Sequence, residues 1–367
     1  ALIAIGQAQH HHHPSRYRLS RLLRSLARQR TLEVLESIQP TSGGFLEATP
    51  LTSFVTMSLA GIGLRDHPVT TRGVEFLVAS VRPDGSWPID TNLATWLTTL
   101  SINALGADAF SDAERATLRR WLLDQQYTTV HPYTQSAPGG WAWTDLPGGV
   151  PDGDDTAGAL LALAVLGDDP EVRTAATAGA AWLIDLQNRD GGIPTFCRGW
   201  GTLPFDQSSP DLTAHALRAW QRWRTVDPRI ERAMEDAVRY LVREQRADGA
   251  WVPLWFGNPW TEDQTNPVYG TARVLECGDL LPSTARQRGT DFLSSMQRAD
   301  GSFGTIEETA LAVSVTGDER GMRWLTARTD LTASPIGLYF AKLWYYEKLY
   351  PLIFTVAALP APGRAET

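Results

Sequence analysis

The sequence contains very little cysteine and no long apolar run. Its two cysteines, Cys197 and Cys277, are too few for a disulfide framework and lack the spacing of a zinc site. We therefore expect a reducing compartment and a cytoplasmic location. No stretch reaches the roughly 18 consecutive apolar residues of a membrane-spanning helix. Positive charge is also in deficit, because the formal net charge is -8, which argues against a nucleic-acid partner.

Tryptophan, in contrast, is abundant: the 367 residues include 14 of them. Several belong to an internal repeat of the form aromatic-Leu-x-x-x-Gln-x-x-x-Gly-x-aromatic, and such repetition is the strongest indicator of architecture in a sequence. The copies, some of them imperfect, begin at Val34, Phe76, Trp121, Trp182, Tyr240 and Phe292.

Each copy is followed by a segment rich in Ala and Thr near a residue type that commonly begins a helix. These segments begin near Thr49, Asn92, Asp155, Asp211, Tyr269 and Glu308. Each repeat therefore predicts an outer helix, a tight Gly turn and an inner helix. Six such hairpins close into a double ring, so we predict an all-α (α/α)6 barrel without a sheet. The Gln and aromatic side chains at each turn are expected to tie neighbouring hairpins together.

The predicted barrel occupies residues 31–360 as one domain. Residues 1–30 form a linker and a basic amphipathic helix, and residues 361–367 form a C-terminal tail. The basic helix carries Leu19, Leu22, Leu23 and Leu26 at helical spacing between arginines. It could lie on an anionic membrane surface, or it could be the first outer helix packed on the barrel. The sequence does not decide between these two interpretations.

A cluster of carboxylates opens one of the inner-helix segments. Residues 152–156 read Asp-Gly-Asp-Asp-Thr, directly before an apolar run. Like charges this close cannot all ionise easily, so one carboxyl tends to keep its proton. A retained proton above an apolar cavity suits an enzyme that protonates an alkene. An Asp cap followed by acidic first-turn residues would give the same pattern without any catalytic role.

The tryptophan-rich repeats together with Asp152-x-Asp154-Asp155 resemble the class II terpene cyclases, most closely squalene–hopene cyclase. Three later segments, 211–215, 255–271 and 345–351, match motifs of that family in the same order. The resemblance covers roughly residues 30–358. It implies the terpenoid cyclase toroid and protonation-initiated cyclisation of a linear isoprenoid. A squalene-like substrate is the first expectation, and a shorter prenyl chain or its diphosphate is the second.

The resemblance also implies roles for individual residues. Asp154 is the general acid, and Asp152 and Asp155 keep a proton on the cluster. Asp211 and His215 lie four positions apart on one helix face, where they are expected to form a hydrogen bond. His215 would then stabilise the carboxylate that Asp154 leaves after proton transfer. Taken alone, His215 is more typical of a core histidine beside a capping Asp, and only its combination with the 152–156 cluster favours the catalytic role.

Aromatic faces stabilise carbocations without acting as nucleophiles. The aromatic residues that match the family's cavity-forming regions are Trp143, Phe196, Trp200, Trp255, Trp260, Tyr269, Tyr339 and Tyr346. The sequence has no Asp-Asp-x-x-Asp motif, so we expect no metal and no cofactor.

The family normally places a second helical barrel against the acid-bearing one, with the substrate between them. This chain has only the acid-bearing barrel, so we expect a partner barrel, either as a missing N-terminal half or as a separate subunit. The apolar start without an initiating Met favours the first. Two other interpretations remain: a non-catalytic, lipid-binding scaffold, and a carbohydrate-active (α/α)6 barrel with paired carboxylates. The carboxylate cluster argues against the scaffold, and the repeat motifs argue against the carbohydrate enzyme.

Overall fold

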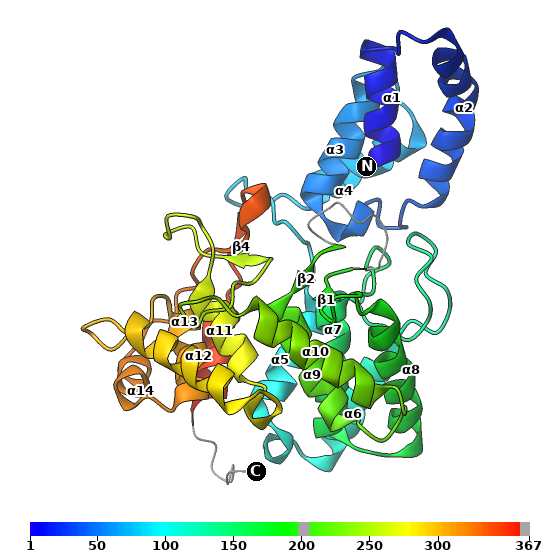
Figure 1. The fold of residues 1–367 in the computed structure, drawn as a ribbon. Helices are drawn as coiled ribbons and strands as arrows, with labels where there is room; N and C mark the ends of the chain where they lie inside the picture. Colours follow the sequence, from blue (N-terminus) through cyan, green and yellow to red (C-terminus); the bar gives the residue numbers. More distant parts are fainter. Residues whose placement is uncertain (197–205, 360–367) are drawn as a thin grey trace. The chain divides into compact units, whose positions relative to one another are not determined.

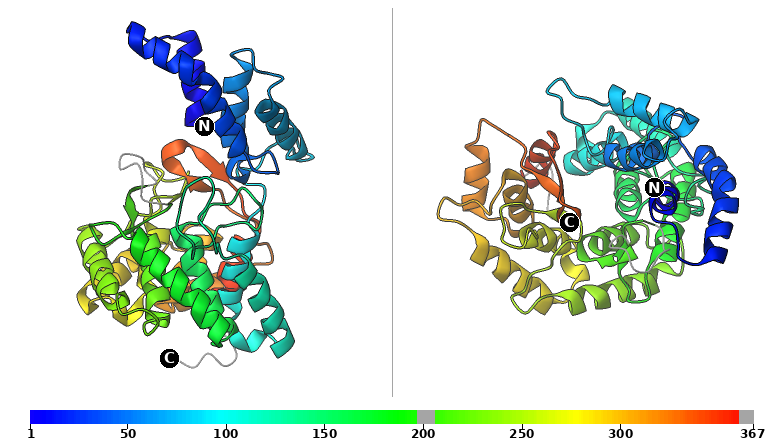
Figure 2. Two further views of the ribbon diagram at one scale, coloured as in Figure 1. Left: turned by 90° about the vertical axis from the view of Figure 1, so that its right-hand side faces the viewer. Right: turned by 90° about the horizontal axis from the view of Figure 1, so that it is seen from above.

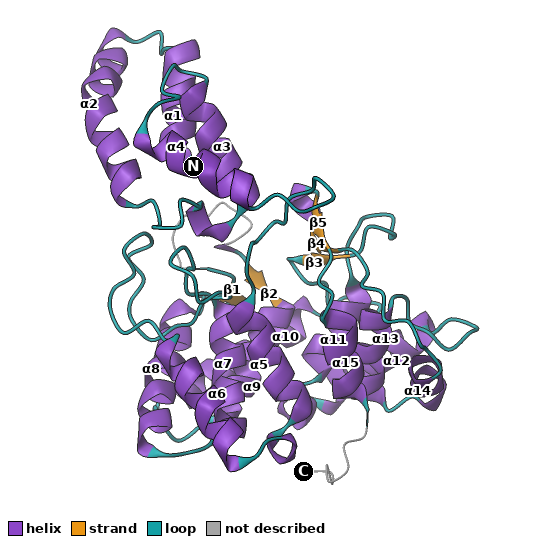
Figure 3. Cartoon of the chain, turned by 180° about the vertical axis from the view of Figure 1, so that it is seen from behind, coloured by secondary structure: helices purple, strands orange, loops and turns teal. Residues whose placement is uncertain are grey.

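The computed structural model describes residues 1–196 and 206–359, and most of them lie in α-helices (Figures 1 and 3). The chain divides into two compact units. The first contains Ala1–Ala94, Pro132–Gln135 and Thr144–Val150, and the second contains the remainder. Among the described residues, no helix has both the length and the apolar character needed to cross a membrane. The predicted all-α fold is confirmed.

The first unit is a small helical assembly. Its helices are α1 (Leu2–His12), α2 (Arg18–Ser37), α3 (Thr49–Ala60) and α4 (Pro68–Ala79). Helix α3 packs against both α1 and α4, and the second half of α2 contributes Leu32 and Leu35 to the same core. The first half of α2 is exposed to solvent along nearly its whole length. Its leucines are therefore more than half exposed to solvent.

The second unit contains the remaining helices. They are α5 (Ala94–Leu105), α6 (Asp112–Asp124), α7 (Gly153–Leu166), α8 (Pro170–Leu186), α9 (Pro210–Arg222), α10 (Ile230–Glu244), α11 (Pro267–Leu275), α12 (Ser283–Met296), α13 (Ile306–Thr316), α14 (Glu319–Thr326) and α15 (Tyr350–Ala358). The odd-numbered helices from α7 to α15 pack consecutively, and Figure 2 shows α8, α10 and α12 outside them. Helix α5 closes this inner ring through two hydrogen bonds. Asn103 donates to the Gly158 carbonyl of α7, and Trp96 Nε1 donates to the Tyr350 hydroxyl of α15 at 2.8 Å.

The predicted inner helices begin within three residues of the expected positions. The helix at Thr49 is nevertheless α3 of the first unit, and the sixth inner helix of the second unit is α15. The predicted domain boundaries after residues 30 and 360 stay predictions, and the expected tail lies outside the described residues.

Two short sheets correct the expectation of no strands. Strands β1 (Ile193–Pro194) and β2 (Ser208–Ser209) pair antiparallel. Strands β3 (Phe256–Gly257), β4 (Ile336–Leu338) and β5 (Leu343–Tyr345) form a second antiparallel sheet, in which Phe256 pairs with Leu338 and Gly337 with Trp344. Strands of two or three residues build no layer of their own. They brace the connections that lead into the inner helices.

The repeat glutamines join neighbouring hairpins, as predicted. Gln187 Nε2 donates to the Gly191 carbonyl of its own turn at 2.8 Å and to the Ala233 carbonyl of the next outer helix at 2.9 Å. Gln245 makes the equivalent pair of bonds to Gly249 and Ala285. One buried carboxamide therefore fixes both the turn and the spacing to the following repeat.

The turns also fix the start of each inner helix. A threonine near the beginning of that helix accepts the backbone N–H at the last position of the repeat. Thr156 does this for Trp141, Thr213 for Ile193, and Thr271 for Trp251, at 2.9–3.0 Å. The side chains that precede α7, α9 and α11 are thereby brought to one end of the inner ring.

The turn glycines allow a sharp stability test. Gly249 has a φ of +92°, and a Cβ there would lie 2.3 Å from the Arg288 carbonyl oxygen. Gly85 occupies the same repeat position with a φ of +81°, but a Cβ there would meet nothing within 4 Å. Both substitutions incur the cost of left-handed backbone, about 1–2 kcal/mol, but only Gly249→Ala adds a clash. We expect urea unfolding to give a clearly larger loss of stability for Gly249→Ala, and equal losses would contradict the close-approach role.

Candidate active site

Helix α7 begins with the acidic cluster. Asp152 is its N-cap, and its Oδ1 accepts the backbone N–H groups of Asp154 and Asp155 at 2.9 and 2.8 Å. The Gly153 N–H donates to the Thr195 carbonyl at 2.8 Å, so the loop from β1 lies directly against the helix start. A Cβ on Gly153 would come within 2.9 Å of the Pro194 carbonyl oxygen, which explains glycine at this position.

Asp154 and His215 are in contact. Asp154 Oδ1 lies 2.5 Å from His215 Nδ1, and the side chains are only 18% and 13% exposed. They come from the packed inner helices α7 and α9, so the predicted proximity is present. The bond uses the imidazole nitrogen nearest the backbone and leaves the two groups able to share one proton.

Asp211 does not form the expected bond with His215. Its carboxylate accepts the Ser209 hydroxyl just before α9, and its other oxygen has no hydrogen-bond partner although it is buried. This corrects the i, i+4 expectation: the two residues share a helix face, but each side chain turns to a different partner. Asp211 still lines the same small hollow as His215.

Burial dominates the electrostatics of the neighbouring carboxyls. It raises the pKa of Asp152 to about 7, against the lowering effect of hydrogen bonds from Asp155. It likewise raises the pKa of Asp211 to about 6, and the Ser209 hydrogen bond opposes it. Near neutral pH the cluster therefore retains a carboxylic proton beside Asp154.

Three charged residues of the site escaped the sequence prediction. Arg273 Nη1 and Glu276 Oε1, one turn apart on α11, form an ion pair at 3.0 Å. Arg218, on α9, pairs with the second oxygen of Glu276. Glu276 and Arg273 line a hollow of about 10 Å³ with Asp154, His215 and other site residues, which gives room for about one water molecule. Charged residues inside an otherwise apolar inner helix were the available signal.

Five aromatic rings form a continuous row near the acidic cluster. Trp143 contacts Phe196 at a centroid distance of 6.2 Å, Phe196 contacts Trp255 at 5.7 Å, Trp255 contacts Phe340 at 6.0 Å, and Phe340 contacts Tyr339 at 5.9 Å. All four contacts are edge-to-face, the favourable arrangement for rings. Phe340 was missed although its neighbour Tyr339 was predicted, and an aromatic residue next to a predicted one was the available signal. Phe196 directly follows Thr195, which places this aromatic row beside the start of α7.

The other predicted aromatic residues have different positions. Tyr269 is buried and lines the hollow beside His215. Trp260 is 75% exposed and Tyr346 62% exposed, so neither belongs to the aromatic row. A loop position in the sequence does not reveal which way a large ring points. Trp200 lies outside the described residues.

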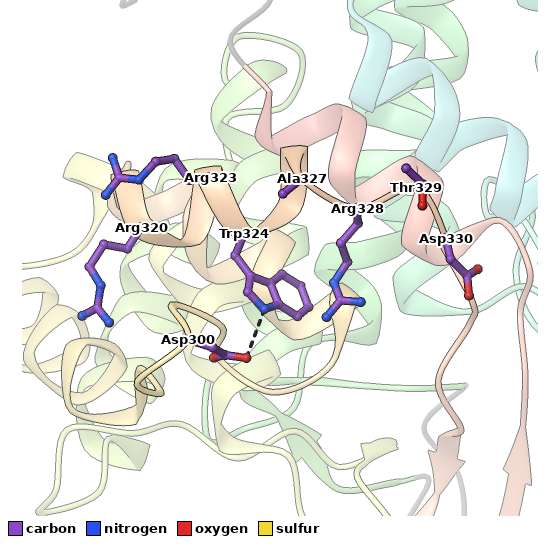
Figure 4. Close-up of a pocket in the computed structure, with 8 residues that line it drawn as sticks. All are labelled: Asp300, Arg320, Arg323, Trp324, Ala327, Arg328, Thr329 and Asp330. Atoms are coloured by element: carbon purple, nitrogen blue, oxygen red, sulfur yellow. Dashed lines mark hydrogen bonds between the residues drawn. The ribbon is translucent and has the colours of Figure 1, made fainter.

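A second, larger hollow lies elsewhere and contains none of the predicted residues. It measures about 630 Å³ and is lined by Arg320, Arg323, Trp324 and Arg328 among others (Figure 4). Trp324 Nε1 donates to Asp300 there, and Arg320 donates to backbone carbonyls. These polar groups are therefore hydrogen-bonded within the protein. Among the described side chains, no three His, Cys, Asp or Glu residues are placed to hold a metal ion.

The chain is similar to known proteins over most of its length. It is 29% identical over 282 residues to the squalene–hopene cyclase of Alicyclobacillus acidocaldarius, covering 69% of this chain and 42% of that protein. It is 29% identical over 264 residues to a drimenyl diphosphate synthase of Streptantibioticus cattleyicolor, covering 67% of this chain and 46% of that protein. The chain therefore spans less than half the length of these two relatives.

A solved structure shares the fold. The ent-copalyl diphosphate synthase from Streptomyces platensis matches with a TM-score of 0.58 and 24% identity, over 78% of this chain and 54% of that chain. The family model of the squalene-hopene cyclase C-terminal domain matches residues 92–327, which begins close to the start of the second unit at Thr95. Since this match covers more than half of the sequence, the chain belongs to the squalene–hopene cyclase C-terminal domain family of the class II terpene cyclases.

Proposed function

We propose that this chain is the acid-bearing part of a class II terpene cyclase, with Asp154 as the general acid. The observation that carries the proposal is the 2.5 Å contact between Asp154 and His215, at the start of a buried helix and beside two further carboxyls. A scaffold barrel has no need to bury an acid and a histidine together in this way.

The proposed reaction begins with proton transfer from the Asp154 carboxyl to the terminal alkene carbon of the substrate. The alkene electron pair forms the new C–H bond, and the adjacent carbon becomes a carbocation. Asp154 is left as a carboxylate. His215 would stabilise this anion by a charge-assisted hydrogen bond, and the N-terminus of α7 would add about 0.3–1 kcal/mol. The same dipole makes Asp154 a stronger acid, as an alkene requires.

The row of five rings would serve the later steps. A carbocation that moves along the folded chain is stabilised by about 0.5–2 kcal/mol for each favourable aromatic contact. Phe196 directly follows Thr195, whose carbonyl accepts from Gly153 at the start of α7, and Phe340 and Tyr339 lie at one end of the row. This order would suit a charge that starts at the acid and travels away from it.

We infer a linear isoprenoid substrate, squalene-like in the first place. The similarity to a drimenyl diphosphate synthase makes a shorter prenyl diphosphate the second candidate. Because the hollow at Asp154 has a volume of only about 10 Å³ and the relatives are longer, we propose that a second helical barrel completes the substrate cavity. Incubation with squalene and with prenyl diphosphates of several lengths, followed by analysis of extracted lipids, distinguishes the two substrate classes.

We also propose that helix α2 attaches the protein to the inner membrane surface. Leu19, Leu22, Leu23 and Leu26 are 56–70% exposed. Six arginines and no acidic residue precede Glu33. Such a helix suits the interface of an anionic bilayer, in which an apolar substrate would dissolve.

Asp154→Asn should reduce cyclisation by about 10²-fold to 10⁴-fold or more while leaving the fold intact, because the amide keeps the volume and loses the transferable proton. The measurement is product formation by the active assembly, with circular dichroism as a check of folding. Asp185→Asn, an exposed change of the same kind on α8, should retain full rate. A parent rate in Asp154→Asn would remove the proposed acid.

Asp152→Asn should change how stability depends on pH. The raised pKa of Asp152, about 7, means that the folded state holds this proton more tightly than the unfolded state. The stabilisation of the folded state by this proton is therefore present in acid and is lost as the pH rises from about 4 through 7. Asn still caps the helix but does not titrate. The Tm of the variant relative to the parent should rise by a few degrees between pH 5 and pH 8, and a constant difference would contradict the shift.

Replacing the four exposed leucines of α2 with serine should abolish flotation with vesicles that contain phosphatidylserine. The parent should bind these vesicles, bind poorly to neutral ones, and dissociate as salt is added. Val74→Ser with Val78→Ser, two exposed apolar changes on α4, should leave binding unchanged. Equal binding of the parent to neutral vesicles would contradict the role of the arginines.

A further inference from the structure

Glu276 joins two inner helices directly beside the Asp154–His215 pair. Its carboxylate accepts from Arg273 on its own helix and from Arg218 on α9, one turn beyond His215. Arg273 lies over the rings of Tyr269 and Phe354, with its guanidinium carbon 5.3 and 4.9 Å from their centroids. All three charged side chains are largely buried. Such a cluster is costly to bury and needs a reason beyond packing.

The cluster is ionised. Burial alone would raise the pKa of Glu276, but Arg218 and Arg273 outweigh it and hold that pKa below the ordinary value. Burial would likewise lower the pKa of Arg273, but Tyr269 and Glu276 raise it above the ordinary value. The ion pairs therefore persist across the pH range in which an enzyme works.

The charged groups around His215 come from several helices. Helix α5 contributes the uncharged Trp96, and α7 contributes Asp154, with Asp152 and Asp155 beside it at the helix start. Helix α9 contributes Asp211 and Arg218. Helix α11 contributes Arg273 and Tyr269, whose phenol stays neutral, and its C-cap residue is Glu276. Glu276 offsets one of the two arginines, so its removal would leave one unbalanced positive charge beside the Asp154–His215 pair.

We propose that Glu276, held by Arg218 and Arg273, is a positioning residue that balances the charge around Asp154 and His215 and so sets the pH range in which this pair keeps its proton. The inference rests on the proposed role of Asp154 as the acid. Glu276 itself touches no reacting atom. It acts through the field at His215, which it reaches across the contact between α9 and α11.

The test uses pairs of variants with opposite charge changes. Glu276→Gln removes a negative charge and should move the titration of the Asp154–His215 pair to lower pH by about one unit. Arg273→Met removes a positive charge and should move it to higher pH by a similar amount. Arg218→Gln also removes a positive charge, at a more exposed position, and should likewise move the titration to higher pH. It replaces Arg273→Met if that variant does not fold. The double variant Glu276→Gln, Arg273→Met should titrate near the parent.

The readout is NMR of histidine-labelled protein without substrate, with the His215 signal assigned by its loss in His215→Asn. Glu235→Gln, an exposed change of the same charge on α10, should leave the titration unmoved. Glu276→Asp, which keeps the charge, should restore most of the parental midpoint. On the active assembly, the alkaline limb of the pH–rate profile should move in the same directions.

The outcomes separate the two proposals. Opposite shifts in the two single variants support the charge balance, whereas shifts of the same sign, or none, would overturn it. If the cluster had a purely structural role, both single variants would lose folding stability, and their titration midpoints would not move in opposite directions. If the titrations move as expected but Asp154→Asn still cyclises its substrate, the charge balance stands and the proposed acid fails.

Discussion

Burial of several carboxylates at one helix start is the constraint on which this site depends. The first N–H groups of a helix need acceptors, and Asp152 supplies one oxygen to two of them at α7. That cap fixes the backbone of Asp154 and Asp155 at the helix start. The Asp154 side chain then bonds outside its own helix, to His215 on α9. Without the cap, the proposed acid would have no defined direction and its pair with His215 no defined geometry.

The repeat turns supply the positional accuracy that this pair requires. Thr213 accepts the N–H of Ile193, the same loop places Thr195 against Gly153, and both contacts lie within a few residues of the site. Small residues complete the arrangement. At Gly158, a Cβ would lie 3.1 Å from the Thr99 hydroxyl and 3.4 Å from the His215 ring, so glycine leaves room for the α5 side chain and for the imidazole. The architecture therefore serves the chemistry through hydrogen bonds that repeat around the ring.

The features that depend on local spacing could be predicted from the sequence. Inner-helix starts follow from capping residues, and the proximity of Asp154 to His215 follows from the order of two motifs. The directions of individual side chains could not be predicted, because they depend on tertiary contacts. The Asp211 carboxylate accepts the hydroxyl of Ser209, two residues before it, instead of bonding to the imidazole at i+4, and Trp260 points to solvent. Ring closure by α15 depends on Trp96 meeting Tyr350, residues separated by 254 positions. The ion pair of Glu276 with Arg218 joins two different helices, so spacing along either segment does not predict it.

The distribution of polar atoms separates the charged site from the aromatic row. Arg218 and Arg273 each donate to Glu276, and Arg273 and Glu276 line the hollow beside His215. Along the row, Trp255 donates its indole N–H to Thr195, and the Tyr339 hydroxyl donates to the Pro253 carbonyl. An indole N–H is a donor without acceptor capacity, and a neutral phenol is a weak base, so neither group readily takes a proton from a carbocation. A row of rings with such edges can stabilise a cation through its π surfaces without quenching it, whereas a free carboxylate in the same place would take its proton. In the proposed mechanism, proton donation and cation stabilisation therefore make opposite demands on local polarity, and the fold would meet them with different side chains of one ring of helices.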